Sequence, residues 1–253
     1  MKKEKFNSKI KKFKTASEYR EFVETCRYAD EGDLTKEQIQ VCLEKQKTSN
    51  DYFMFAAYAH SLTQQQVQIC LDGQKSAKDC QYFANSFQIY LTKKQLQICL
   101  NKQKTAKDHM DFVTDCYNNL APSQIQVCLD KQKDSFDFLW IAKTCQNNLT
   151  SKQLQLCLNK QESWLDFMRI AEYCHRSFTN KQLQSCLEKQ ITADNYFLFA
   201  KYCQESMSKE QMQICINKLE TAGQSRRFAK NCLYNLTREQ HQFCKSKGWF
   251  NLI

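Results

Sequence analysis

Apolar and polar positions along the chain follow one pattern that recurs every 28 or 29 residues. The third copy reads LTKKQLQICLNKQKTAKDHMDFVTDCYNN, and the fifth reads LTSKQLQLCLNKQESWLDFMRIAEYCHRS. A fixed period of about 20–50 residues is typical of proteins built from stacked structural repeats. With the first residue of each copy taken as position 1, the repeats begin at Leu34, Leu62, Leu91, Leu120, Leu149, Phe178, Met207 and Leu236.

Each repeat carries two signals for the start of a helix. Thr92 and Gln95, at positions 2 and 5 of the third repeat, form the pattern of a capping box, in which each side chain bonds to a backbone N–H of the other residue. Thr105 and Asp108, at positions 15 and 18, repeat this signal with an acid that favours the positive end of a helix dipole. The sequence therefore predicts a first and a second helix in each repeat, joined by a short turn.

One face of each predicted helix has the i, i+3, i+4, i+7 spacing of an amphipathic helix. This face takes positions 6, 9, 10 and 13 of the first helix and positions 19, 22, 23 and 26 of the second. In the third repeat the residues predicted to be buried are Leu96, Cys99, Leu100, Gln103, His109, Phe112, Val113 and Cys116.

The same signals continue at both ends of the repeated region. Thr15 and Glu18 begin a helix of the second type, and one helix of the first type follows Leu236. We expect a basic N-terminal arm (1–14), an N-terminal capping helix (15–33), seven helical-hairpin repeats (34–235) and a C-terminal capping helix (236–253). The predicted fold is an all-α, right-handed α-solenoid of seven helix-turn-helix repeats of about 29 residues, with terminal half-repeats.

Composition and charge exclude several classes of protein. Four glycines and one proline are too few for the turns of an all-β fold. No apolar run is long enough to span a membrane, and none follows the lysine-rich start, so we expect no secretory signal and an intracellular protein of the cytoplasm or nucleus. Seven lysines and one glutamate in residues 1–14 account for +6 of the net charge of +10.

Fourteen of the fifteen cysteines occupy positions 9 and 26 of the repeat, or the position equivalent to 26 in the N-terminal half-repeat. Stacked helices lie about 8–10 Å apart, which is too far for a disulfide between equivalent cysteines. Each helix also offers one thiol, whereas a zinc site needs three or four ligands. We therefore predict small buried core residues, with no metal site and no cofactor. A cysteine-based metal or redox protein is the alternative.

No catalytic constellation is present in the sequence. His60, His109, His175 and His241 fall at different positions of the repeat, and none recurs beside a carboxylate. A glycine-rich phosphate loop is also missing. We expect a protein that is not an enzyme and has no small-molecule substrate.

A uniform row of polar residues follows the back of the first helix. Position 7 is Gln in every repeat, and position 12 is Lys in all but the second repeat, which has Gly73. Such a ladder would suit a phosphate backbone. Alternatively, the glutamines bond between stacked repeats and the lysines complement helix C-termini. The ladder lysines are Lys45, Lys102, Lys131, Lys160, Lys189, Lys218 and Lys247.

The outer side of the second helix (positions 20, 21, 24 and 27), by contrast, varies from repeat to repeat, as positions 20 and 21 show. Aromatic residues, Met and Arg are frequent there, and these types are enriched in protein interfaces. Variation within a uniform array suits a partner that does not itself repeat, and the alternative is drift on a solvated face. The candidate partner-binding residues are Phe53, Met54, Tyr82, Met110, Leu139, Trp140, Met168, Arg169, Phe197, Arg226 and Arg227.

The layout resembles other two-helix solenoids. The opening Leu-Thr-x-x-Gln-Ile of Leu34–Ile39 also resembles the start of transcription-activator-like effector repeats, over about six positions of each repeat. That resemblance implies DNA binding through a residue pair between the two helices, which aligns here with Lys45 and Gln46 and with Lys102 and Gln103.

These observations favour a non-enzymatic helical-repeat scaffold that binds a protein or peptide partner through the variable face of its second helices. The alternative is an RNA- or DNA-binding repeat protein that uses the lysine and glutamine ladder along the phosphate backbone. We expect no membrane partner.

Overall fold

A computed structural model describes residues 1–28, 34–59, 61–232 and 236–247. Within these residues the chain is all-α, with two short 3-10 turns and no β-strand, which confirms the predicted fold class. Internal contacts divide the chain into an N-terminal body (Met1–Gln124) and a C-terminal body (Ile125–Ile253). We describe each body by itself, and the handedness of the solenoid and its number of repeats stay predictions.

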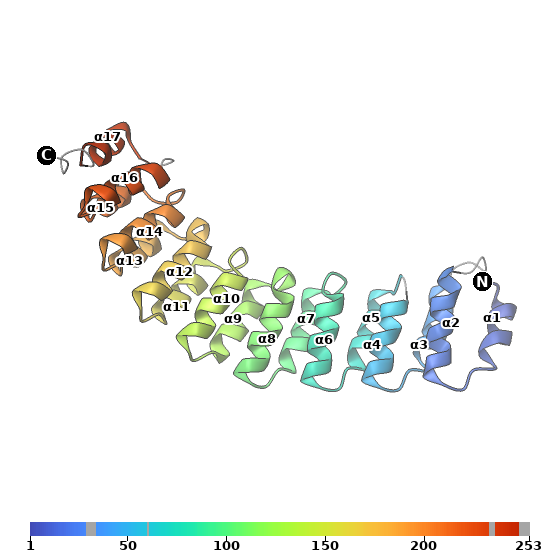
Figure 1. Cartoon of the computed structure of the whole chain (residues 1–253). Helices are drawn as coiled ribbons and strands as arrows, with labels where there is room; N and C mark the ends of the chain where they lie inside the picture. Colours follow the sequence, from blue (N-terminus) through green and yellow to red (C-terminus); the bar gives the residue numbers. More distant parts are fainter. Residues whose placement is uncertain (29–33, 60, 233–235, 248–253) are drawn as a thin grey trace. The chain divides into compact units, whose positions relative to one another are not determined.

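First and second helices alternate along the N-terminal body (Figure 1). The second-type helix α4 packs against α2 and α5, and α6 packs against α7 and α8. This body holds α1 (Lys3–Ile10), α2 (Ala16–Tyr28), α3 (Lys36–Leu43), α4 (Ser49–Tyr58), α5 (Gln64–Asp72), α6 (Ala77–Phe87), α7 (Lys93–Asn101), α8 (Ala106–Cys116) and the 3-10 turn η1 (Tyr117–Asn119).

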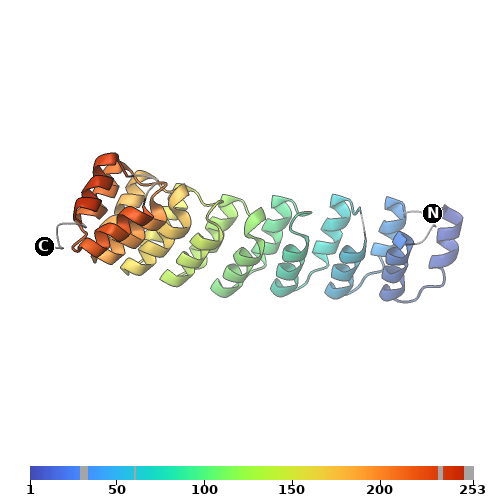
Figure 2. The ribbon, with the colours of Figure 1, turned by 45° about the horizontal axis from the view of Figure 1, so that its top comes forward.

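Helix α9 (Pro122–Lys131) spans the boundary between the bodies. In the C-terminal body, α10, α12, α14 and α16 form one row in which each contacts the next and also the first-type helix that follows it (Figure 2). The helices are α10 (Ser135–Thr144), α11 (Ser151–Asn159), α12 (Trp164–Cys174), α13 (Asn180–Glu188), α14 (Ala193–Cys203), α15 (Lys209–Asn217), α16 (Ala222–Asn231) and α17 (Arg238–Lys247), with the 3-10 turn η2 (His175–Ser177).

The segment expected to be a basic arm contains helix α1. Phe6 is buried on this helix, and its ring lies 5.9 Å from that of Phe22 in α2. Phe13, in the link after α1, lies 5.3 Å from the same ring. Among the lysines, Phe6, Ile10 and Phe13 follow an i, i+4, i+7 spacing. This spacing gives the segment an apolar side that packs on α2.

Capping boxes form at most of the predicted helix starts, whereas α10 has no side-chain cap bond and in α12 only the side chain of the cap residue accepts a backbone N–H. In α7, the backbone N–H of Gln95 donates to Thr92 Oγ1 at 3.2 Å, and Gln95 Oε1 accepts the N–H of Thr92 at 2.9 Å. In α8, Thr105 and Asp108 bond in the same reciprocal way. Each box satisfies backbone groups that a helix N-terminus leaves without intrahelical partners.

The position-5 glutamines have a second role that the sequence did not reveal. While Oε1 accepts from the cap of its own helix, Nε2 donates to the position-3 carbonyl of the preceding repeat, so each amide joins two repeats. These hydrogen bonds run from Gln66 to the carbonyl of Lys36 (2.8 Å), from Gln124 to that of Lys93 (2.7 Å), from Gln182 to that of Ser151 (2.7 Å) and from Gln240 to that of Lys209 (2.9 Å).

The core follows the predicted faces. All eight residues predicted to be buried in the third repeat are buried, and so are all fifteen cysteines. Gln103, the polar member of this set, donates from Nε2 to the carbonyls of Cys99 (2.9 Å) and Ala77 (3.2 Å). The prediction of cysteines as small core residues is therefore confirmed for their burial, since closely packed helices favour small side chains.

Candidate partner-binding surface

The second-helix face is defined here as positions 17, 20, 21 and 24, which share one side of a helix. Position 21 is exposed where it holds Tyr82, Trp140, Arg169 and Arg227, and Met54 is half-buried there. At position 20, Phe53 and Met110 are half-buried and Arg226 is exposed, whereas Leu139, Met168 and Phe197 are only 6, 8 and 3% exposed.

The prediction of exposed contacts is therefore wrong for three candidate partner-binding residues, Leu139, Met168 and Phe197. Position 20 points toward the second helix of the next repeat. The ring of Phe53 lies 6.5 Å from that of Phe83, and the ring of Phe197 lies 6.3 Å from that of Phe228. Because a helix in a row has a neighbour on its flank as well as beneath it, position 20 joins the core between repeats.

An exposed aromatic cluster lies on α10 and α12 of the C-terminal body. Phe136 is 62% exposed and Trp140 is 38% exposed, and their rings stack with centroids 6.1 Å apart. The ammonium of Lys143 lies 5.4 Å from the Trp140 ring and 4.8 Å from the ring of Tyr173. Phe136 was missed from the sequence, although its i, i+4 spacing to Trp140 places both on one stripe.

Basic residues recur along the second-helix face of α10, α12, α14 and α16. Arg227 lies over the ring of Phe197 at 4.4 Å, and its guanidinium is 3.9 Å from the Asp194 carboxylate. Six bases and two acids occupy the face, for a net charge of +4: Lys143, Arg169, Lys201, Arg226, Arg227 and Lys230 against Glu172 and Asp194.

The lysine ladder lies against the preceding repeat, over its position-19 side chain. Three ammonium groups sit 5.7–5.8 Å from an aromatic ring at that position, in the pairs Lys160 with Phe138, Lys189 with Phe167 and Lys218 with Tyr196. Where position 19 is Cys80, Lys102 donates instead to the Gln74 carbonyl at 2.6 Å. Lys45 and Lys131 are exposed, and the side chain of Lys247 lies outside the described residues.

Gly73 interrupts the ladder for a reason that the structure supplies. A Cβ at this residue would overlap the ring of Tyr52, the position-19 aromatic of the first repeat. The ring therefore packs directly on the backbone at the place where a lysine stem lies in later repeats.

The glutamine ladder at position 7 bonds mainly within its own helix. In the first seven repeats the amide donates to the side chain at position 11, as in Gln97 to Asn101 at 2.7 Å and Gln184 to Glu188 at 3.0 Å.

The prediction that position-7 glutamines link stacked repeats is confirmed for two of them, since Gln184 Oε1 accepts from Gln211 Nε2 at 3.4 Å and Gln213 Oε1 accepts from Gln240 Nε2 at 3.1 Å. The position-5 glutamines make further links between repeats, through backbone carbonyls.

Burial decides the chemistry of most cysteines, whereas a hydrogen bond with Cys99 lowers the pKa of Cys80. Burial raises the pKa of Cys70, Cys157 and Cys186 to about 12, so these thiols are protonated at neutral pH and are poor metal ligands or nucleophiles. Across the described ranges, no group of three or more His, Cys, Asp or Glu side chains is arranged to hold a metal ion.

The histidines do not share a site. His109 Nδ1 lies 2.8 Å from the Thr105 carbonyl, and His175 Nδ1 lies 2.9 Å from Ser206 Oγ. Burial lowers the pKa of His175. His60 lies outside the described residues.

Comparison with known proteins adds little to this picture. Neither a protein-family model nor a curated protein is similar to this chain, so the resemblance to transcription-activator-like effector repeats stays a prediction. One solved structure, from work on the computational design of self-assembling cyclic protein homo-oligomers, is similar at 11% identity over 97% of this chain and 91% of that one. Its TM-score of 0.16 is too low to support any argument.

No helix in the described part of the chain is both long and apolar enough to cross a membrane.

Proposed function

We propose that the protein is a non-enzymatic helical-repeat scaffold, inside the cell, that binds a protein partner through the second-helix face of its C-terminal body. The observation that carries the proposal is the exposed, stacked pair of Phe136 and Trp140. Two large rings on one stripe leave a contiguous apolar area in contact with solvent, and such exposed apolar patches are typical of binding surfaces. Aromatic residues and arginine are also the types that dominate binding energy at protein interfaces.

The chemistry of the face indicates what such a partner would carry. Its net charge of +4 favours an acidic segment, and the rings favour apolar side chains within it. The ammonium of Lys143 lies near the rings of both Trp140 and Tyr173. A partner carboxylate would pair with Lys143 while a neighbouring apolar side chain of the partner contacts the rings. The expected partner is therefore an acidic protein segment with Leu, Phe or Trp among its Asp and Glu residues.

The absence of enzymatic activity is part of the proposal. Its support is the protonated state of the buried thiols whose pKa burial raises to about 12, such as Cys157, and the scattered positions of the histidines. An intracellular location is proposed on the same cysteines, because thiols persist in reducing compartments.

The test is a binding titration with peptides that combine Asp or Glu with Leu, Phe or Trp. We expect the triple variant Trp140→Ala, Arg169→Glu, Arg227→Glu to bind at least about 30-fold more weakly, as expected for loss of interface anchors. The control variant changes Phe243→Ala, Lys152→Glu and Lys181→Glu, which are exposed residues on first-type helices of the same body. Equal loss in both variants, or a preference of this face for single-stranded RNA over every peptide, would refute the proposal.

A second candidate function is supported by the turns between first and second helices in the N-terminal body. Position 12 is joined there by lysines at positions 14 and 17, and the set is Lys45, Lys47, Lys75, Lys78, Lys102, Lys104 and Lys107. The nearby Asp108 accepts the N–H of Lys104 (3.1 Å) and of Thr105 (2.9 Å), so its charge is directed to the helix start. Such a row suits the phosphates of a single-stranded nucleic acid.

Fluorescence anisotropy with polyuridylate RNA tests this candidate. The variant Lys102→Glu, Lys104→Glu, Lys107→Glu is expected to abolish binding that weakens steeply with salt. A matched control reverses three lysines near the starts of α3 and α7, namely Lys36, Lys93 and Lys94. If both variants lose binding equally, the turns are not the site.

A further inference from the structure

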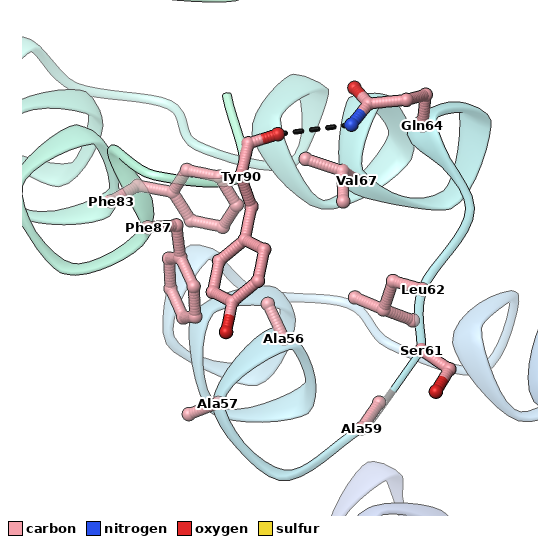
Figure 3. A pocket seen from close by; sticks show the side chains of 10 residues that line it. All are labelled: Ala56, Ala57, Ala59, Ser61, Leu62, Gln64, Val67, Phe83, Phe87 and Tyr90. Carbon is pink, nitrogen blue, oxygen red and sulfur yellow. Dashed lines mark hydrogen bonds between the residues drawn. The ribbon is translucent and has the colours of Figure 1, made fainter. Parts of the chain in front are cut away.

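Two neighbouring repeats depart from the cysteine row at position 26. The first repeat has Ala59 there and the second has Phe87, whereas the five following repeats have cysteine. Both departures line the same cavity, of about 220 Å³, in the N-terminal body (Figure 3). The small residue and the large one therefore belong to one local feature of the fold.

The cavity stays open because Phe87 is held to its wall. The Phe87 ring lies 4.7 Å from that of Phe83, in a tilted pair, and 5.5 Å from that of Phe53, edge to face, so it packs against these rings instead of filling the space beside Ala59. Phe87 and Tyr90 lie on one side in Figure 3, with Leu62 across from them.

The turn on the other side of the cavity has an unusual backbone. This first repeat is one residue shorter than the others, and Ser61 has a φ of 63°, the left-handed region that favours glycine. Backbone strain at a non-glycine residue persists only where its surroundings hold it, and such residues are frequent in ligand sites. In this short repeat, Ser61 and Leu62 both line the cavity.

The lining indicates the chemistry of a ligand. None of the ten lining residues that the structure describes is charged, so a charged group would lose hydration without gaining a partner among them. Aromatic rings, alanines, Leu62 and Val67 provide apolar contact, and the Ser61 hydroxyl offers a polar one. The Gln64 amide already donates to the Tyr90 carbonyl at 3.0 Å. A dry cavity of about 150 Å³ admits benzene, so this volume suits one ring with a small substituent or a fused pair.

We propose that this cavity is a binding site for one neutral aromatic ring, of phenol or indole size. The ring belongs either to a free small molecule or to a Tyr or Trp side chain of a bound protein. The rim favours neither source by charge, but Ile89, next to Tyr90, is 75% exposed and would contact the chain on either side of an inserted residue. The site does not depend on the proposed protein-binding face, whose residues belong to the C-terminal body.

Titration of the full chain with indole and with phenol, followed by thermal shift and by ligand-detected NMR, tests the site. We expect saturable binding at millimolar concentrations or below. Ala59→Leu and Ala57→Leu add carbon atoms inside the lining and should each weaken it at least about tenfold. Ala57 is exposed, so its variant keeps the test valid if the Ala59 variant does not fold.

Thr114→Leu is the matched control for Ala57→Leu, because Thr114 holds the same position 24 in α8 and does not line the cavity. The proposal would be overturned if neither indole nor phenol binds saturably. It would also be overturned if Ala59→Leu and Ala57→Leu bind the ligand as tightly as wild type does.

A second arm separates the two sources of the ring. A short neutral peptide with one Trp is compared with free indole on wild type, Ile89→Ser and Ile191→Ser, where Ile191 is an equally exposed control at 73%. Tighter binding of the peptide that only Ile89→Ser weakens assigns the site to a protein side chain. Tighter binding of free indole, unaffected by Ile89→Ser, assigns it to a small molecule.

Discussion

The buried thiols make the protein sensitive to alkali. Burial raises the pKa of seven cysteines from the ordinary 9.0 to about 12, namely Cys42, Cys70, Cys116, Cys145, Cys157, Cys186 and Cys232. In the unfolded chain the same thiols ionise near pH 9. Between these values the folded state binds more protons than the unfolded state, so stability is full below about pH 9 and falls as pH rises toward 12.

The expected loss is large. One such thiol contributes a slope of about 1.4 kcal/mol per pH unit within this window, and about 1.4 kcal/mol has been lost by pH 10. Seven of them would remove about 10 kcal/mol in total, comparable with the whole stability of many domains. We therefore expect unfolding near pH 10, well before lysine side chains lose most of their charge.

The assay is urea unfolding at several pH values, followed by far-UV circular dichroism with a phosphine reductant present. The double variant Cys157→Ala, Cys186→Ala will start less stable, because it leaves two cavities. Its stability should nevertheless fall less steeply above pH 9, by about 2.7 kcal/mol per pH unit. A slope equal to that of wild type would show that these thiols do not titrate in the unfolding equilibrium, and the reasoning would fail.

Two other substitutions test packing between repeats, each against a matched control. Gln182→Ala removes an amide that joins two repeats and should lower the free energy of unfolding by about 1–3 kcal/mol. Gln155→Ala, which removes a bond to Asn159 within one helix, should change it by less than about 0.5 kcal/mol in urea titrations. Gly73→Ala drives a Cβ into the ring of Tyr52 and should destabilise by about 1–3 kcal/mol in thermal unfolding. Gly223→Ala, which meets no atom closer than 3.9 Å, should stabilise by about 0.4–1 kcal/mol, and a loss there would contradict the geometry.

The sequence predicted the helices and most of their buried faces because both follow from short-range spacing. Thr92 and Gln95 mark a helix start, and Leu96 and Cys99 mark its buried side, without any knowledge of the neighbouring repeats. Leu139 shows where that reasoning ends. It lies outside the apolar stripe of its own helix but is buried, because burial at position 20 depends on a neighbouring helix and not on spacing within the chain.

The candidate sites were harder to predict for the same reason. Trp140 stood out as a large ring on a variable position, but the stacking of Phe136 upon it requires side-chain coordinates. The cavity left two traces in the sequence, a repeat that is one residue short and the change to Ala59 and Phe87 in the cysteine row. Neither feature reveals whether Phe87 fills the space or, as the structure has it, packs at a tilt against Phe83.

Uniformity among the repeats has a physical meaning that bears on both proposals. The glutamines at positions 5 and 7 recur because each bonds to a group that recurs with it, the neighbouring carbonyl or the position-11 side chain. Where the contacted group changes, the contact changes too, as with Gly73 beneath Tyr52. The exposed residues at position 21 recur in no such way, so packing between repeats does not specify them. Packing does not determine which residues this face carries, and yet it carries Trp140 beside Phe136. Binding to a partner would account for selection of such residues there.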